Sequence, residues 1–571
     1  MKITKYMKGN WKYAILAPIC ILIDTLGSIL VPFFTSLIID NGIANSDVNY
    51  IYKIGIYMVV VSLLSMIGGF FAMYFSSKAS YGFGANLRQD LIDKIQEFSF
   101  ANINKFTTSS LITRLTNDVE VLVNLVQMCL RMVVRTPIML IGGIFMMINL
   151  STNIAKIFFL LIPILFIVMG CVIVKAFPLF KVVQEKIDRV NAVIRENLIG
   201  SRVVKSFVRQ DFENNRFKKA NDDLMNTSIK GFNIMLTLMP IVSLIMNLSI
   251  AAVLWVGASG SVEVGSISAC ITYMTITLMS LMMLSMVFMN FSRAKASYDR
   301  IKEILIEKPS IQNKENPVTE SIKNGDVEYN VKEFCFEDSK GEAILNNIKF
   351  NVKAGETVAI IGSTGTGKST LVNLMPRFYD VTDGYVKIDG KDVKDYDVKT
   401  LRDSIGMVLQ ENRLFAGTIE ENIKWGKEDA TEEEVKHACK VAQIDEYIEN
   451  LPDKYNSRVE QRGANFSGGQ KQRLAIARAL IKKPKILILD DSVSALDSTT
   501  ENNLRKSLNE EFKDTTIFMI VQKISSCKDV DRVLVIDDGT IVGNGKHEEL
   551  MENNEIYKEI YESQKEVMPE K

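Results

Sequence analysis

Long apolar segments dominate the first half of this 571-residue chain. Six of them reach roughly 18 residues or more, the length at which a helix crosses a bilayer. The first is too long for a signal-peptide core, and no small-residue cleavage site follows it. We therefore predict six membrane-spanning helices instead of the buried helices of a large soluble protein; they cover residues 13–40, 51–77, 121–149, 156–178, 233–257 and 266–291.

The placement of Lys and Arg predicts the orientation of these spans. The short connections 41–52, 150–155 and 257–269 contain neither residue, whereas the N-terminus and the longer connections 78–119 and 181–230 are basic. Basic connections stay on the cytoplasmic side of a membrane. Both termini and both long connections are therefore expected in the cytoplasm.

The two long connections also repeat apolar residues at helical spacing. Residues 87–100 and 185–208 show this pattern and contain no proline. We expect the membrane helices to continue well past the bilayer and to turn back near Phe106–Ser110 and near Gly200–Ser201. An extension of about 20 residues would reach about 30 Å.

The composition changes after the sixth apolar segment. Residues 305–325 hold two prolines and no apolar period, which is typical of a linker. Short β-rich runs then alternate with helical patterns, which predicts a parallel α/β domain. The expected organisation is an all-α six-helix transmembrane domain over 1–304, a linker over 305–325 and an α/β domain over 326–571.

A glycine-rich phosphate loop is the strongest local motif. Residues 358–370 read VAIIGSTGTGKST, in which a β-rich run leads into Gly-x4-Gly-Lys-Ser and a helical pattern follows. Glycines let backbone N–H groups wrap phosphates, Lys368 would reach the β and γ phosphates of a nucleotide, and Ser369 would bind Mg²⁺. The expected ATP-binding residues here are Gly362, Ser363, Thr364, Gly365, Thr366, Gly367, Lys368, Ser369 and Thr370.

Two further segments complete the pattern. The run KILILD over 485–490 predicts a buried parallel strand that carries Asp490, a second Mg²⁺ ligand, at its end. The segment 464–480 places Ser467, Gly468 and Gly469 at the start of a helix, which makes a second anion cradle. One chain does not need two phosphate cradles for one nucleotide, but two chains facing each other would.

The motif order resembles an ATP-binding cassette. GSTGTGKST is followed by VLQEN (408–412), FSGGQ (466–470), ILILD (486–490) and SALD (494–497). With six spans ahead of it, the whole chain is similar to a bacterial half-size ABC exporter of the multidrug type, with the type I exporter fold. In that family two half-transporters pair, and two ATP molecules lie between their cassettes.

The resemblance implies further roles. Gln410 would contact Mg²⁺, and Phe336 stands where the family usually has a tyrosine that stacks on adenine; a core aromatic of a strand is the alternative for Phe336. Asp497 would lie at the dimer seam. Ser467, Gly468, Gly469 and Gln470 would bind the ATP of the partner chain, and the turns near Phe106–Ser110 and Ile199–Ser201 would dock on the cassettes.

Two positions depart from the family pattern. The usual general base is a glutamate directly after the Walker B aspartate, where this chain has Asp491, and the usual switch histidine is replaced by Gln522. The only two histidines, His437 and His547, lie elsewhere in the sequence. An aspartate carboxylate sits about 1.5 Å short of a glutamate's, and about 1 Å of misplacement can cost on the order of 10²-fold in rate. Glutamine exchanges no proton near neutral pH.

These departures resemble the degenerate-site subunit of a heterodimeric ABC exporter. Such a subunit binds ATP, hydrolyses it slowly and lends an intact signature to its partner, which would bring the glutamate and the histidine. Neutral drift in an active homodimer is the alternative. A regulatory or channel-like ATP-binding subunit is a second functional hypothesis, and lipid or peptide cargo also remains open.

Composition limits the partners. With 67 Lys and Arg against 67 Asp and Glu, the chain is not expected to bind nucleic acid, and the resemblance places it in a bacterial cell membrane.

The sixth span is rich in methionine, which suits either an adaptable substrate surface or simple packing. Asp24, Arg131 and Arg135 lie within predicted spans; we favour pairing or a cavity-lining role, with arginines reaching the cytosolic end as the alternative.

Overall fold

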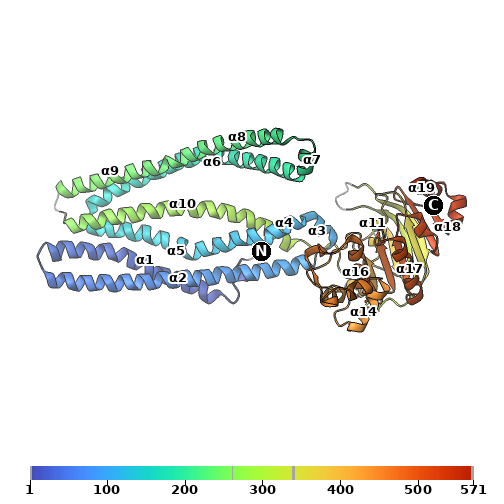
Figure 1. Cartoon of the computed structure of the whole chain (residues 1–571). Coiled ribbons are helices and arrows are strands. Elements are labelled where there is room, and N and C mark those ends of the chain that lie inside the picture. Colours follow the sequence, from blue (N-terminus) through green and yellow to red (C-terminus); the bar gives the residue numbers. More distant parts are fainter. Residues whose placement is uncertain (1–2, 260–261, 337–340, 495, 568–571) are drawn as a thin grey trace. The chain divides into compact units, whose positions relative to one another are not determined.

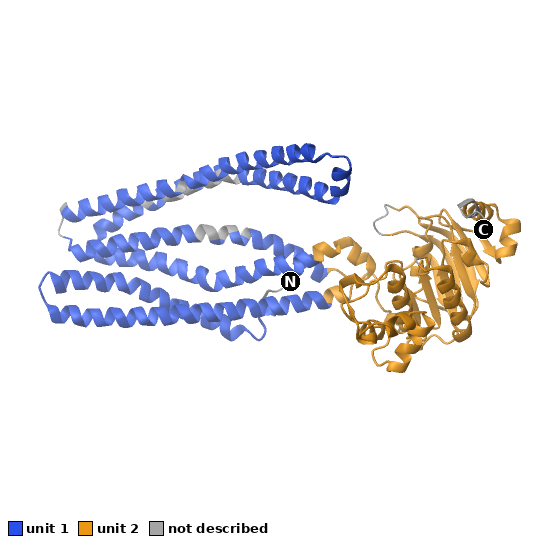
Figure 2. Ribbon diagram, in the orientation of Figure 1, with its two compact units in different colours: residues 1–93, 112–306 blue, residues 94–111, 307–571 orange. Residues whose placement is uncertain are grey.

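The chain forms two compact units in the computed structural model, which describes residues 3–259, 262–336, 341–494 and 496–567 (Figure 2). Unit 1 contains residues 1–93 and 112–306, and unit 2 contains residues 94–111 and 307–571. A short piece of the first half of the chain thus belongs to the same unit as the whole second half.

Unit 1 is helical (Figure 1). Among the residues that the structure describes, five apolar helical segments are long enough to cross a membrane: 11–43, 48–96, 108–150, 210–258 and 264–283. The fourth predicted span, 156–178, lies within one long helix, several of whose side chains are outside the described residues. The elements are η1 (Ile3–Met7), α1 (Trp11–Leu37), η2 (Ile38–Ile43), α2 (Val48–Gln96), η3 (Arg114–Asp118), α5 (Val119–Leu150), α6 (Thr152–Ile199), α7 (Ser201–Ser206), α8 (Gln210–Leu236), α9 (Leu238–Ser259) and α10 (Val264–Ile306).

The helices of unit 1 pack in two groups. α5 lies along α10, and α1 packs on both, while α6 lies along α8 and α9 (Figure 1). The apolar core between them includes Met147, Phe158 and Tyr273, all at most 1% exposed. The Tyr273 hydroxyl donates to the carbonyl of Ile29 at 2.6 Å, so this buried polar group is satisfied.

Helix boundaries differ from the sequence prediction at two places. The expected span 233–257 is divided at Thr237 between α8 and α9; Pro240 lacks the N–H that a continuous helix would need. The extension of α2 ends at Gln96, before the expected turn at Phe106–Ser110. A new helix, α3 (Phe100–Phe106), starts there because Ser99 and Asn102 form a capping box.

The charged residues of the predicted spans separate into a pair and a single arginine. Arg135 forms an ion pair with Asp24 at 2.9 Å, and the Ser65 hydroxyl donates to the same carboxylate at 2.9 Å. Arg131, one helical turn before Arg135, has no ion pair or hydrogen bond among the described residues. The expected pairing therefore holds for Asp24 and Arg135 but not for Arg131.

The methionines of the sixth predicted span do not share one environment. Met274 is 1% exposed, whereas Met279 and Met283 are 52% and 46% exposed. Met286 and Met289 have side chains outside the described residues. Within this span, Met274 therefore packs in the core, and Met279 and Met283 contribute to the surface.

Unit 2 is built on two sheets. An antiparallel sheet has the order β2-β1-β4-β5, and a six-stranded sheet has the order β12-β11-β3-β10-β9-β6, in which every pair is parallel except β11 with β12. The strands are β1 (Val327–Phe334), β2 (Leu345–Val352), β3 (Thr357–Ile361), β4 (Asp383–Ile388), β5 (Lys391–Asp392), β6 (Ile405–Val408), β9 (Ile486–Asp490), β10 (Thr516–Ile520), β11 (Arg532–Asp537) and β12 (Thr540–Gly545), with a separate pair β7 (Gly417–Thr418) and β8 (Arg458–Val459).

Helices cover the sheets of unit 2. Strands β9 and β10 are buried at every residue, as expected for a parallel sheet covered on both faces. The α-helices from residue 100 to 113 and after residue 326 are α3, α4 (Thr108–Thr113), α11 (Lys368–Asn373), α12 (Val398–Asp403), α13 (Ile419–Lys424), α14 (Glu432–Val441), α15 (Asp445–Glu449), α16 (Gly468–Leu480), α17 (Ser498–Glu511), α18 (His547–Asn553) and α19 (Glu555–Val567).

The segment expected to be a linker is held against unit 2. The Asn313 side chain donates to Asp397 at 2.7 Å, and Val318 forms a backbone bridge with Tyr396. At its end, the carboxylate of Asp389 accepts four backbone N–H groups, from residues 323–326, at 2.8–3.1 Å. These bonds fix where the chain enters β1.

Candidate nucleotide-binding site

The residues expected to handle ATP converge because of strand order. Strands β3, β10, β9 and β6 are neighbours and all run in the same direction. Their carboxyl ends therefore meet at one edge of the sheet, which is where ligands bind in open α/β sheets. The phosphate loop follows β3, Gln522 follows β10, Asp490 ends β9, and Gln410 follows β6.

The phosphate loop joins β3 to α11 through left-handed glycines. Gly365 and Gly367 have φ angles of 88° and 94°, a region that favours glycine. A Cβ atom at Gly362 would lie 2.1 Å from the carbonyl oxygen of Ile536, so a side chain does not fit there. Ser363, Thr364 and Gly365 are exposed at the crest, and Thr366 donates to the carbonyl of Ser363 at 2.9 Å.

Lys368 lies inside this loop. Its Nζ atom donates to the carbonyls of Gly362 and Ser363 at 2.9 and 2.6 Å. Burial lowers the pKa of the Lys368 ammonium, and the charges of Asp491 and Asp490 oppose that shift. The ammonium is thus held next to two carboxylates at the strand edge, where it can pair with an anionic ligand.

Ser369 and Asp490 suit a divalent cation. The Ser369 hydroxyl donates to the Asp490 carboxylate at 2.9 Å, so two hard oxygen ligands converge from α11 and β9. Burial raises the pKa of Asp490, with hydrogen bonding from Ser369 opposing the shift. Mg²⁺ prefers such oxygen ligands together with phosphate oxygens, and the residues present therefore fit it. Thr370 follows them in the first turn of α11.

Asp491 and Gln522 contact each other directly. The side-chain amide of Gln522 donates to Oδ2 of Asp491 at 2.6 Å, while Oδ1 of Asp491 is buried without a hydrogen-bond partner among the described residues. Asp491 has a φ of 49°, a left-handed conformation that aspartate tolerates better than most residues. The two positions that depart from the family pattern thus form one hydrogen-bonded pair at the strand edge.

The signature residues lie on a different element. Ser467 caps α16 by a reciprocal capping box with Gln470, in which the Ser467 N–H donates to the Gln470 side chain at 2.8 Å. Gly468 and Gly469 form the first turn, and Ser467 and Gly468 are exposed. Gln410 is also exposed, and Asp497, exposed too, caps α17 through bonds to the Thr500 backbone and hydroxyl at 3.0 and 2.7 Å.

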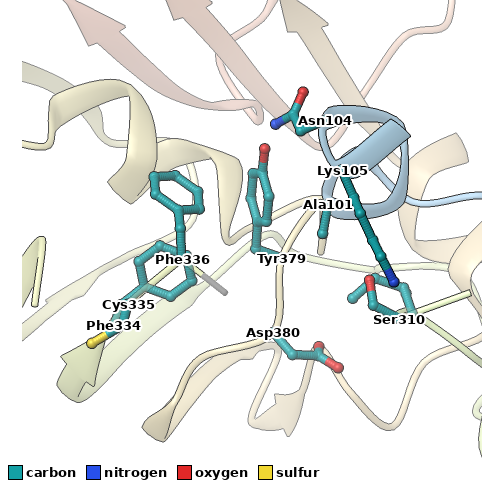
Figure 3. Close-up of a pocket in the computed structure, with 10 residues that line it drawn as sticks. Ala101, Asn104, Lys105, Ser310, Phe334, Cys335, Phe336, Tyr379 and Asp380 are labelled. Carbon is teal, nitrogen blue, oxygen red and sulfur yellow. The ribbon is translucent and has the colours of Figure 1, made fainter. Parts of the chain in front are cut away.

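Phe336 belongs to an aromatic cluster beside a cavity (Figure 3). Its ring packs edge-on against Phe334 and Tyr379, at centroid distances of 5.1 and 4.9 Å. The cavity has a volume of 430 Å³, and α3 contributes Asn104 and Lys105 to its lining. Phe336 is half-buried, so part of its ring faces solvent and a planar ligand can reach it.

The contribution of α3 to this region was only partly expected from the sequence. The Phe100 ring lies 4.6 Å from that of Phe378, and Asn102 donates to the carbonyl of Lys308 at 3.1 Å. The sequence predicts the docking turn several residues later, near Phe106–Ser110, and gives no signal for Tyr379. The capping sequence SFAN over 99–102 was the signal that a separate helix begins there.

The two histidines lie in other places. His437 on α14 pairs with Glu511 at 3.0 Å, and the ring of His547 shares a hydrogen bond with the Tyr557 hydroxyl at 2.8 Å. Neither contact involves the residues at the carboxyl edge of the sheet. Burial lowers the pKa of His547, which favours its neutral form.

Family models match both halves of the chain. Residues 14–286 match the ABC transporter transmembrane region, and residues 345–494 match the ABC transporter model. The type I exporter fold is shown by a bacterial Atm1-family ABC exporter solved with ATP bound, which is 24% identical, covers 98% of this chain and 99% of that one, and has a TM-score of 0.81.

Curated relatives extend over nearly the whole chain. The ABC transporter ATP-binding protein YfiB of Bacillus subtilis is 41% identical over 99% of this chain and 98% of its own length. YgaD of the same organism, described as a putative multidrug export ATP-binding/permease protein, is 34% identical over 86% of this chain and 85% of its own. The chain has a helical membrane unit and a phosphate loop whose Ser369 contacts Asp490, and its relatives match nearly its full length. It therefore belongs to the ABC transporter family, as a half-size exporter with its transmembrane region fused to an ATP-hydrolysing cassette.

Proposed function

We propose that this chain is the degenerate-site subunit of a heterodimeric, ATP-driven exporter of amphipathic small molecules. Its own site binds Mg-ATP through the phosphate loop, Ser369, Gln410 and Asp490, and it hydrolyses ATP slowly. Its signature residues complete the competent site of a second half-transporter, which carries the catalytic glutamate and the switch histidine. Both termini and the cassette lie on the cytoplasmic side of a bacterial cell membrane.

The contact between Asp491 and Gln522 is the observation that carries this proposal. A general base must accept a proton from the attacking water, and a switch residue must exchange one. Gln522 cannot exchange a proton, and its amide occupies the Asp491 oxygen that lies 2.6 Å away. The short carboxylate of Asp491, hydrogen-bonded to the amide of Gln522, supports a site that still binds ATP but hydrolyses it slowly.

The exposed signature supports the second half of the proposal. Ser467 and Gly468 are exposed at the start of α16, and their backbone and hydroxyl groups suit an anionic ligand supplied from another chain. Asp497 is exposed beside Thr500 at the start of α17. Because these residues are intact, this chain would lend a working signature to its partner.

A second contact with the partner is proposed at α7. The residues around this helix are apolar and exposed: Ile199 is 80%, Val203 is 60% and Phe207 is 73% exposed. Exposed apolar clusters of this kind favour protein–protein contact. We assign this tip to docking on a cassette of the transporter, as expected from its position between two long helices.

The test is ATPase activity with and without a partner. The chain is purified alone in lipid nanodiscs, and it is also recovered by an affinity tag from its native membrane, with the co-purifying half-transporter identified by mass spectrometry. We expect little ATP hydrolysis by the chain alone and robust hydrolysis by the pair. Robust turnover by the chain free of partner would overturn the degenerate-site assignment.

A regulatory or channel-like role is the alternative function. The exposed Met279 and Met283 favour an exporter, because flexible thioethers make adaptable apolar surfaces for varied ligands. ATP-dependent accumulation of an amphipathic dye in vesicles that contain the pair distinguishes the two. Dye flux that continues unchanged without ATP would favour the channel-like role, and the same assay with labelled lipid or peptide tests those cargoes.

A further inference from the structure

A cavity between α5 and α10 carries positive charge. It has a volume of 280 Å³ and lies within unit 1, at the start of the predicted third span and the end of the predicted sixth span. Arg131 reaches it from α5, and Arg293 reaches it from α10. The other lining residues are either apolar or carry neutral amides: Val121, Asn124, Leu125, Gln127, Met128, Met132 and Asn290.

Three carboxylates on α5, on the turn before it and on its neighbour α1 already have basic partners. Asp24 pairs with Arg135 at 2.9 Å, and Glu120 pairs with Arg88 at 3.3 Å. Asp118, which is 3% exposed, accepts hydrogen bonds from Arg300 and from Ser297. No carboxylate is among the described lining residues of the cavity.

Arg131 and Arg293 are therefore uncompensated. Neither has an ion pair or a hydrogen bond among the described residues. Arg131 lies within the predicted third span, where a charged side chain is expensive and usually faces a cavity that serves substrate or ion passage, and Arg293 lies two residues past the predicted sixth span. Arginine also offers a planar fork of donors that matches carboxylate, sulfate or phosphate groups.

The apolar part of the lining completes the recognition surface. Met128 and Met132 are one turn apart on α5, and Val121 and Leu125 extend the same side of the helix. The Gln127 amide already donates to the Ser77 hydroxyl at 2.9 Å, which anchors the wall of the cavity to α2. A ligand that satisfies both parts has an anionic head and an apolar body.

We propose that this cavity binds the anionic head of an amphiphile, with Arg131 and Arg293 as the paired recognition residues. This rests on the proposed exporter function and narrows its substrate class from amphipathic compounds in general to anionic ones. The anion belongs either to a soluble amphiphile or to the headgroup of an anionic lipid, since both present the same chemistry to the two arginines.

The experiment measures binding to the full chain in phosphatidylcholine nanodiscs without nucleotide. The probes are a dansyl-labelled medium-chain fatty acid and its uncharged methyl ester, followed by fluorescence. We expect the acid to bind more tightly than the ester. The double variant Arg131→Gln with Arg293→Gln should weaken binding of the acid on the order of tenfold or more and leave the ester unchanged, because charge-assisted hydrogen bonds are lost.

Two control variants separate recognition from folding. Arg131→Lys with Arg293→Lys keeps both charges but lacks the planar fork, so binding of the acid should fall less than in the glutamine double variant. Arg195→Gln removes one positive charge from the exposed part of α6, outside the cavity, and should change nothing. Equal binding of acid and ester to the unchanged chain, or an equal loss of both in the glutamine double variant, would overturn the proposal.

A second arm identifies the source of the anion. Nanodiscs that contain phosphatidylglycerol are compared with phosphatidylcholine alone. Displacement of the fatty acid by phosphatidylglycerol supports the site and assigns it to a lipid headgroup, and undiminished binding supports it and assigns it to a soluble amphiphile. Because no nucleotide is used, a failure here is distinguishable from a failure of the ATPase test above.

Discussion

The ring of Phe100 on α3 lies 4.6 Å from the ring of Phe378 in the cassette, so a segment between two membrane helices packs directly on the ATP-binding domain. The Phe98 and Phe106 rings stack at 5.7 Å and hold α3 in place behind this contact. The nearby cavity also takes Asn104 from α3 and Phe336 from the cassette. Because α3 follows α2 directly in the chain, we expect this contact to carry the state of the cassette to the membrane helices.

Replacing Phe100 with Ala should uncouple transport from hydrolysis. An aromatic pair contributes about 0.5–1.5 kcal/mol beyond its buried area, so the variant should fold but transmit poorly. We expect ATP hydrolysis by the assembled transporter to stay within about twofold and vesicle transport to fall on the order of tenfold, since 1.4 kcal/mol is a factor of ten. Tyr561→Ala on α19, an aromatic truncation at a distant part of unit 2 (Figure 1), is the control. Parallel losses of hydrolysis and transport would count against coupling through Phe100.

The two sites should respond unequally to substitution. Asp491→Asn should change the ATPase of the pair only modestly, because the proposed function assigns slow turnover to that site. Ser467→Asp should reduce it by at least tenfold: aspartate preserves the helix cap but repels the partner's phosphate. Steady-state phosphate release from the purified pair measures both, and thermal unfolding confirms that α16 is intact. Equal losses from the two variants would contradict the assignment.

Restoring the family residues should restore hydrolysis to the chain alone. Asp491→Glu combined with Gln522→His supplies a longer base and a proton-exchanging partner in place of the pair now 2.6 Å apart. Recovering about 1 Å of placement is expected to raise the rate on the order of 10²-fold. Asp491→Gln with Gln522→His, which has the length without the charge, is the matched control. No gain in the first variant would mean that another feature limits the rate.

Much of this arrangement followed from the sequence because its signals are local. The phosphate loop, the strand ending at Asp490 and the helix starting after Ser467 each combine a period with a turn residue, and the structure contains all three elements. The strand order that joins them depends on pairing between distant segments, which no local pattern contains. The hydrogen bond between Asp491 and Gln522 is one result of that order.

Long-range side-chain partners could not be read from the sequence. The choice of Arg135 over Arg131 as the partner of Asp24 is set by helix rotation, which hydropathy does not report. The end of α2 at Gln96 differs from the prediction because the apolar period continues through Phe100, whereas the capping box at Ser99 starts a new helix. The packing of the supposed linker is a third case, since Asp389 holds it from a turn more than sixty residues away.

Asp389 should make unit 2 sensitive to acid. Burial raises the pKa of its carboxyl, but four backbone N–H donors outweigh burial and hold that pKa below 3.8. A group with a lowered folded-state pKa stabilises above its unfolded pKa and loses that effect as pH falls through the folded value. Asp389→Asn should therefore lower the melting temperature at neutral pH, and the difference should shrink only below about pH 3.8.

Thermal unfolding of the full chain in detergent, followed by fluorescence at several pH values, measures this effect. Asp383→Asn is the control, because Asp383 is an exposed carboxylate paired only with Lys332 at 3.2 Å among the described residues. Surface pairs of this kind contribute about 0–1 kcal/mol. A melting difference for Asp389→Asn that is independent of pH would show that the four bonds do not require the charge.

Nucleotide should remain at this site while the partner's site turns over. Lys368, Ser369 and Asp490 are in place at the strand edge, whereas Asp491 and Gln522 stand where the family usually has the base and the switch histidine. Each 1.36 kcal/mol added to the hydrolysis barrier slows it tenfold, so a barrier higher by a few such steps holds ATP over several cycles of the partner. The retained nucleotide would keep the two cassettes partly in contact and favour an inward-open resting cavity.

Equilibrium binding of labelled ATP to the pair should show one slowly exchanging nucleotide. Lys368→Ala should abolish this binding, and chelation of Mg²⁺ should release the nucleotide. Lys513→Ala, a lysine truncation outside the phosphate loop, is the control and should leave the nucleotide in place. Simultaneous emptying of both sites, or fully separated cassettes with ATP still bound at the partner's site, would refute retention.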